Sequence, residues 1–204
     1  MRNKRYNGSN YTTLNPTGAD GWVSALAVDG NNVVGTYDVG RYTYGFLYDG
    51  VTYTTIAPVG SKWTAPTDVD GNRIVGNWND GSRSHGFLYD GSTYTIIDVP
   101  GALDTQVEGI SGNNIVGYYH REGTNYAFVY DNSHYKTIGF ANDGWAAAWG
   151  VDGNNVVGEW SGGGRGFLYV YADTEGSGGG EVPEPNTLAM FLGLGGMGLI
   201  VAYR

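Results

Sequence analysis

The sequence has no cysteine, only three histidines, and fewer basic than acidic side chains. Without cysteine the fold contains no disulfide and the chemistry no thiol nucleophile. His85, His120 and His134 are scattered without the spacing of metal ligands, so we expect neither a metal nor another cofactor. The 11 Lys and Arg residues are outnumbered by 20 Asp and Glu residues, which gives a formal charge of −9. Such a surface repels phosphates, so we expect no nucleic-acid partner.

A helical pattern is also missing before residue 186, and the chain instead repeats itself. The phrase Asp-Gly-Asn-Asn-Val-Val-Gly begins at Asp29 and returns with small changes at Asp70, Ser111 and Asp152, each time after 41 residues. A second phrase, Gly-Phe-Leu-Tyr, begins at Gly45 and returns in fixed phase with the first. A unit of about 40 residues with several short strands is typical of a β-propeller blade.

Each unit contains four short segments rich in Val, Ile, Tyr, Phe and Thr, which suit β-strands. Asp-Gly and Gly-Asn pairs between them predict tight hairpins, because Gly and Asn tolerate a positive φ. In one copy the predicted strands are 45–48, 53–57, 67–69 and 73–78. The strand with the smallest side chains, 67–69 and its counterparts, is expected at the crowded centre, with 58–66 as the long connection between blades.

The two ends of the repeat region predict how it closes. Residues 11–14 match the fourth strand of a unit, whereas the last unit stops after its third strand, at 166–170. Pairing Phe167, Leu168 and Tyr169 with 11–14 would remove two free strand edges and close a four-bladed, all-β propeller over residues 1–172. The alternative is that 166–170 is donated to the next molecule, which predicts filaments of a structural protein.

The composition changes after the repeats. Residues 173–181 form a flexible Gly/Ser linker, and residues 188–202 are apolar or glycine throughout, ahead of Arg204. As a helix this stretch is near the lower length limit for crossing a bilayer. We therefore predict a C-terminal hydrophobic helix that anchors the chain in a membrane.

The motif at the start of this tail, Val-Pro-Glu-Pro, precedes the glycine-rich apolar span and the terminal Arg204. This order resembles the PEP-CTERM sorting signal of Gram-negative bacteria, over residues 182–204. The resemblance implies processing by an exosortase near Pro183, Glu184 and Pro185, transient anchoring in the inner membrane, and delivery to the cell surface or extracellular biofilm matrix. It also implies a secretory leader, and because residues 1–10 have no apolar core we expect one ahead of them.

The repeats carry a second resemblance. Residues 85–91, His-Gly-Phe-Leu-Tyr-Asp-Gly, followed by 94–101, Tyr-Thr-Ile-Ile-Asp-Val-Pro-Gly, are similar to the bacterial extracellular HAF repeat. The similarity spans most of residues 6–170. It implies an extracellular propeller-like fold and no particular activity.

Aromatic residues supply the candidate binding site. Trp22, Trp63 and Trp145 each lie seven residues before the repeated hairpin, in the predicted loops between blades, and His85 and Tyr126 are expected on the same face. Indole rings there would stack on sugars, so we predict a ligand site for exopolysaccharide or another matrix component. The competing interpretation is that each Trp only covers the apolar layer between blades.

Two other chemical interpretations are weaker. Asp68 to Asn72 has the alternating oxygens of a calcium loop, but the counterparts of Asp68 are Ala27, Gly109 and Gly150, so a turn is favoured. A Ser84, His85 and Asp80 set lies within one loop and occurs in no other copy. We expect a protein that is not an enzyme.

Overall fold

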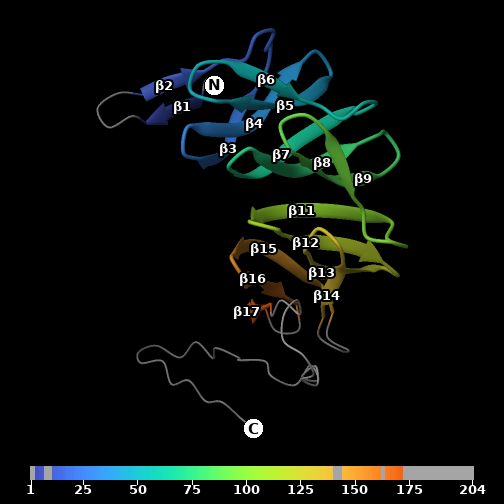
Figure 1. Ribbon diagram of the computed structural model, residues 1–204. Helices are drawn as coiled ribbons and strands as arrows, with labels where there is room; N and C mark the ends of the chain where they lie inside the picture. Colours follow the sequence, from blue (N-terminus) through green and yellow to red (C-terminus); the bar gives the residue numbers. More distant parts are fainter. Residues whose placement is uncertain (1–2, 7–10, 140–143, 162–163, 172–204) are drawn as a thin grey trace.

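The computed structural model (Figure 1) describes residues 3–6, 11–139, 144–161 and 164–171. These residues form strands and turns without any helix, so the predicted all-β class is confirmed. The predicted linker and the C-terminal helix lie outside the described residues. The strands are β1 (Asn3–Tyr6), β2 (Tyr11–Leu14), β3 (Val23–Asp29), β4 (Asn32–Val39), β5 (Tyr42–Tyr48), β6 (Tyr53–Ile56), β7 (Trp63–Asp70), β8 (Arg73–Asn79), β9 (Ser84–Tyr89), β10 (Tyr94–Ile97), β11 (Asp104–Ser111), β12 (Asn114–Arg121), β13 (Thr124–Tyr130), β14 (Tyr135–Ile138), β15 (Ala146–Asp152), β16 (Asn155–Trp160) and β17 (Arg165–Val170).

Each repeat folds into an antiparallel meander in which every strand pairs with the next along the chain. β3–β6, β7–β10 and β11–β14 are four-stranded units, β15–β17 has three strands, and β1–β2 is a separate hairpin. A single parallel pair, Thr43 with Trp63, links the first two units. The predicted strands are present, and the first strand of each unit is longer than expected, since β7 runs from Trp63 to Asp70.

The repeated phrase contains two glycines, and the structure requires glycine at each position for a different reason. The glycine after Asp70 has a φ of 59° at the first position of a two-residue hairpin turn, a conformation that suits glycine. The glycine that ends the phrase lies opposite a β-bulge in the preceding strand. A Cβ on Gly117 would lie 1.9 Å from the carbonyl oxygen of Gln106, and Gly35, Gly76 and Gly158 are equally crowded.

The units stack face to face along one direction. The first strand of each unit contacts three strands of the unit before it: β7 packs on β3, β4 and β5, β11 on β7, β8 and β9, and β15 on β11, β12 and β13. The side chains between these units include Phe87 and Phe128, and Phe46 packs with Leu14 of β2 in the cluster on the N-terminal side of the first unit; all three phenylalanines are fully buried. Because inner sheets are covered on both faces, their middle strands are apolar on both sides.

The hairpin turns of successive units are joined by side chains. The Asp29 carboxylate accepts a hydrogen bond from the Gly71 N–H at 2.7 Å, and Asp70 accepts one from Gly112 at 2.6 Å. In the next unit the Ser111 hydroxyl takes the same role. The repeated acidic residue therefore connects neighbouring sheets in addition to forming its own turn, and no group of metal-binding residues occurs in the described part of the chain.

The predicted pairing of the two ends was wrong. β2 pairs with β1, so that Thr12 lies opposite Arg5, whereas β17 pairs with β16, so that Phe167 lies opposite Gly158. Figure 1 shows the β1–β2 hairpin and the β15–β17 sheet at opposite ends of an open stack. The physical reason is that ring closure depends on the rotation between successive sheets, which a repeat period does not report. The N-terminal polar residues also pair with β2, because a short hairpin needs only backbone groups.

Candidate functional site

The three predicted tryptophans occupy the same place in successive units. Trp22 and Trp145 directly precede β3 and β15, and Trp63 is the first residue of β7, so they begin the first strand of a unit instead of lying in the middle of a long loop. All three are partly exposed. The structure brings one of them, Trp145, into a pocket with other side chains.

The other two predicted site residues lie within the sheets. His85 on β9 is almost fully buried and stacks on Trp78, with ring centres 4.6 Å apart. Its Nδ1 lies 2.7 Å from the Asp98 carboxylate. Tyr126 on β13 is partly buried and stacks on Tyr119 at 5.3 Å. Neither lines the pocket that contains Trp145.

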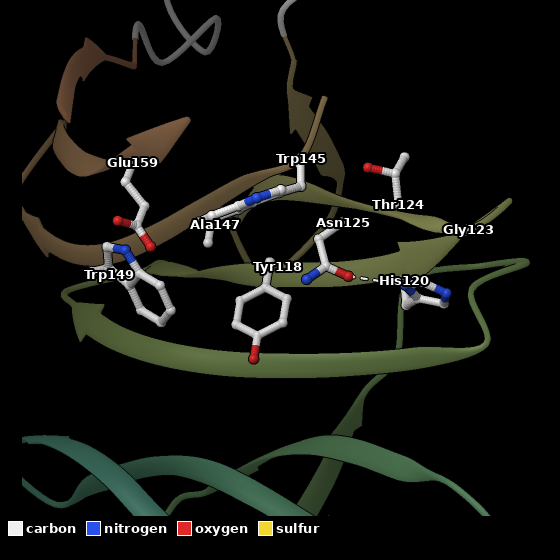
Figure 2. Close-up of a pocket in the computed structure, with 9 residues that line it drawn as sticks. All are labelled: Tyr118, His120, Gly123, Thr124, Asn125, Trp145, Ala147, Trp149 and Glu159. Carbon is white, nitrogen blue, oxygen red and sulfur yellow. Dashed lines mark hydrogen bonds between the residues drawn. The ribbon is translucent and has the colours of Figure 1, made fainter. Parts of the chain in front are cut away.

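This pocket has a volume of about 400 Å³ and lies where the fourth sheet meets the third (Figure 2). Its floor and walls come from β12, the start of β13, β15 and β16. The residues that line it are Tyr118, His120, Gly123, Thr124, Asn125, Trp145, Ala147, Trp149 and Glu159.

Sheet geometry determines how the aromatic side of the pocket forms. Trp149 sits at the β-bulge of β15, where the pairing register with β16 shifts between Ala148 and Gly150. The extra residue redirects its side chain, and the indole meets the Tyr118 ring edge to face at 5.7 Å. Trp149 and Trp145 are both partly exposed, so two indoles and one phenol border the same space.

Strand register supplies the polar side. Tyr118 and His120 are two residues apart in β12 and therefore lie on the same face of the sheet. Asn125 on β13 lies directly opposite His120. The His120 Nδ1 and the Asn125 Oδ1 are 2.9 Å apart, an arrangement in which the imidazole donates to the amide oxygen. Figure 2 shows this pair toward one end of the pocket, Trp149 toward the other with Glu159 above it, and Tyr118 between them.

A partly buried carboxyl group, that of Glu108, contributes to the electrostatics near Tyr118. Burial raises the pKa of Glu108, on β11, from 4.5 to about 7. Burial and the charge of Glu108 together raise the pKa of Tyr118. The phenol is therefore a neutral hydrogen-bond donor at physiological pH, which suits a hydroxyl-rich ligand.

Sequence reasoning found only Trp145 among the pocket residues and missed Trp149, Tyr118, Asn125 and Glu159. A signal was present in the repeats. The position of Trp149 is Leu26, Thr67 and Glu108 in other copies, so a large aromatic residue at the bulge occurs once. A residue that departs from its repeat is a candidate for a role beyond packing.

A second polar cluster lies in the β7–β10 sheet. The pairing register places Thr64, Trp78 and His85 in one row across three strands, with Asp98 just beyond β10. Arg83 lies 3.1 Å from the Asp98 carboxylate, and Asp80 lies 3.6 Å from the His85 Nε2. Ser84 and His85 are adjacent in a strand and so point to opposite faces, which separates two members of the weakly predicted triad.

The part of the chain that the structure describes contains no membrane-spanning helix. The predicted anchor at 188–202 and the processing residues Pro183, Glu184 and Pro185 lie outside them. In comparisons with known proteins, no protein-family model matches this chain, and no curated protein matches it.

Proposed function

We propose that this chain is a non-enzymatic protein of the bacterial cell surface or extracellular matrix that binds a polysaccharide. The observation that supports the proposal is the pocket in which Trp145, Trp149 and Tyr118 surround one space beside polar side chains. Aromatic rings bind the C–H faces of sugars, and amide, imidazole and carboxylate groups bind their hydroxyls. A volume of about 400 Å³ suits a few sugar rings of a longer chain.

The charge of the protein narrows the ligand class. The chain carries a formal charge of −9, and Glu159 lines the pocket. An anionic polymer would be repelled by both, so a neutral polysaccharide is the favoured ligand.

The setting in which this binding takes place comes from the resemblances. Residues 182–204 resemble a PEP-CTERM signal, and we propose export, transient anchoring in the inner membrane and processing by an exosortase at Pro183, Glu184 and Pro185. The sheets are then the blades of a propeller-like array displayed at the cell surface. Intact-mass analysis of protein from its native cell tests the processing step, and a mass that includes residues 186–204 contradicts it.

The binding test is affinity electrophoresis through gels that contain dextran, hydroxyethyl cellulose, alginate or xanthan. We expect retardation by a neutral polymer and less by the anionic ones. Trp149→Ala removes one stacking ring and should weaken binding about tenfold, equivalent to about 1.4 kcal/mol. Trp22→Ala is the matched control, because Trp22 is more exposed than Trp149 and lies outside the pocket.

The two variants decide between pocket binding and a general effect of surface aromatics. Equal retardation of wild type and Trp149→Ala would reject the pocket as the binding site. Equal loss in both variants would assign binding to the repeated tryptophans that the sequence predicts. Absence of retardation by all four polymers would remove the support for polysaccharide binding.

The alternative function, a structural subunit of extracellular filaments, stays a second candidate. The observation in its favour is the exposure of Val157, which is buried at the same position in the three other copies.

A further inference from the structure

The three contacts between successive sheets use the same residues. A valine in the second strand of one sheet shares an apolar cluster with an aliphatic residue in the first strand of the next sheet. The pairs are Val34 with Val69, Val75 with Ile110, and Val116 with Val151. The three second-strand valines have exposed fractions of 0%. One pattern of apolar contact therefore stacks every sheet on its neighbour.

The two ends of the stack each present half of this pattern. Val157 in β16 is the fourth second-strand valine, and it is 48% exposed. Val28 in β3 is the first of the first-strand residues, and it is 63% exposed. Among the described residues, no sheet follows Val157 and no four-stranded sheet precedes Val28, which explains why both are more exposed than their buried or partly buried counterparts.

The hydrogen bonds between successive turns also leave one unmatched group at each end of the stack. In the chain, the Asp or Ser that begins each turn accepts a hydrogen bond from the turn glycine of the next unit, as Asp70 does from Gly112 and Ser111 from Gly153. In the described part of the chain, no hydrogen bond reaches the carboxylate of Asp152, the last residue of this series. The same holds for the N–H of Gly30, the first of these glycines. One end thus offers an acceptor and the other a donor.

We propose that these two faces bind each other between copies of the chain, head to tail. Val157 of one copy then packs on Val28 of the next copy, and Asp152 accepts a hydrogen bond from Gly30 there. The occupant of each face is a second copy, because the contact continues the interface that the chain already forms three times within itself. A contact between two different faces that does not close on itself produces an open fibre.

The N-terminal hairpin shows how the stack continues. β1 pairs with β2 in the register by which β5 pairs with β6, with Asn3 opposite Leu14 as Gly45 is opposite Ile56. β2 therefore lies where the fourth strand of a preceding sheet belongs, and β1 where its third strand belongs. Within the residues that the structure describes, which end at 171, the sheet β15–β17 supplies strands one to three and no fourth. On association, β17 of the preceding copy takes the place of β1 beside β2.

This exchange replaces one short antiparallel pairing by another of similar length, so the backbone hydrogen bonds nearly cancel. The burial of the apolar end faces then determines whether the exchange favours the associated state. The incoming strand contributes Gly166, Phe167 and Leu168 in place of Asn3, Lys4 and Arg5, and aromatic and aliphatic residues suit a sheet better than these polar ones. Association is therefore favoured by burial and opposed by the displacement of β1.

The experiment uses the full chain in a non-ionic detergent micelle solution and measures mass by sedimentation velocity over a concentration series. Wild type is expected to grow in mass with concentration. Val157→Asp and Val28→Asp each place a charge on one end face and should raise the half-association concentration at least tenfold. Val51→Asp is the matched control, since Val51 is 84% exposed at the β5–β6 corner, and it should associate like wild type.

A mixture of the two end-face variants is the measurement that tests head-to-tail association most directly. Each variant keeps one intact face, so an equimolar mixture of Val28→Asp and Val157→Asp should form dimers and stop there. Three results would overturn the proposal. The first is a wild-type protein that stays monomeric up to roughly 100 μM, a concentration well above the dissociation constants of specific interfaces. The second is association that is unchanged in both variants, which assigns it to another segment such as the apolar tail, and the third is a mixture that forms no dimers. Circular dichroism confirms that each variant is folded.

Discussion

Replacing Glu108 with glutamine is expected to remove a pH dependence of the stability of the repeat region. Burial raises the pKa of Glu108 from 4.5 to about 7. Between these two values the unfolded chain has released the proton and the folded chain still holds it. The free energy of unfolding therefore falls as pH rises through this window, by at most about 1.36 kcal/mol per pH unit. The stabilisation is fully present below pH 4.5 and is lost as pH rises through about 7.

The size of the effect follows from the window and from solvent exposure. A window of about 2.5 pH units sets an upper bound of about 3.4 kcal/mol, and partial exposure of the carboxyl group reduces the expected loss to about 1–2 kcal/mol. Glutamine has the same shape and no charge. Glu108→Gln should thus match wild type at pH 4 and be more stable than wild type by about 1–2 kcal/mol at pH 8.

The assay is urea unfolding followed by tryptophan fluorescence, at half-unit steps from pH 4 to pH 8. The quantity compared is the difference in unfolding free energy between Glu108→Gln and wild type, because groups common to both proteins cancel. Glu122→Gln is the control, on an exposed turn. A constant difference across the whole range would refute the reasoning, since it would mean that Glu108 ionises in the folded protein as it does in the unfolded chain.

Two further substitutions test the contacts that build the stack. Asp70→Ala removes the acceptor of a hydrogen bond from the next turn and should cost about 1–2 kcal/mol in urea unfolding, whereas Asp152→Ala, in the same turn motif at the end of the stack, should cost little in dilute monomer. An equal cost for both would mean that the acid acts only within its own turn. Gly117→Ala places a Cβ 1.9 Å from a backbone carbonyl and should destabilise by at least about 3 kcal/mol, while Gly150→Ala meets its nearest atom at 3.5 Å and should cost less than about 1 kcal/mol. A mild effect of Gly117→Ala, seen as an unchanged thermal midpoint, would show that the bulge can relax.

The candidate site was only partly visible in the sequence. Trp145 could be selected because its position is repeated as Trp22 and Trp63, and repetition is a property of the sequence. Trp149 and Tyr118 become a pair only when the bulge of β15 and the stacking on β12 bring two units together. His85 shows the opposite case, because a residue expected on an open face stacks on Trp78 inside the sheet.

The sequence by itself determined the class, the repeating unit and the turns. These depend on neighbours a few residues apart: alternating apolar residues form strands, and glycine at a position of positive φ, as at Gly71, forms a hairpin. Only the tertiary structure decided that the sheets form an open stack with unlike ends. The rotation between sheets results from many side-chain contacts across each interface, among them those of the fully buried Val34, Val75 and Val116. A small difference in this rotation, repeated at every interface, separates a ring from a stack, and no local pattern records it.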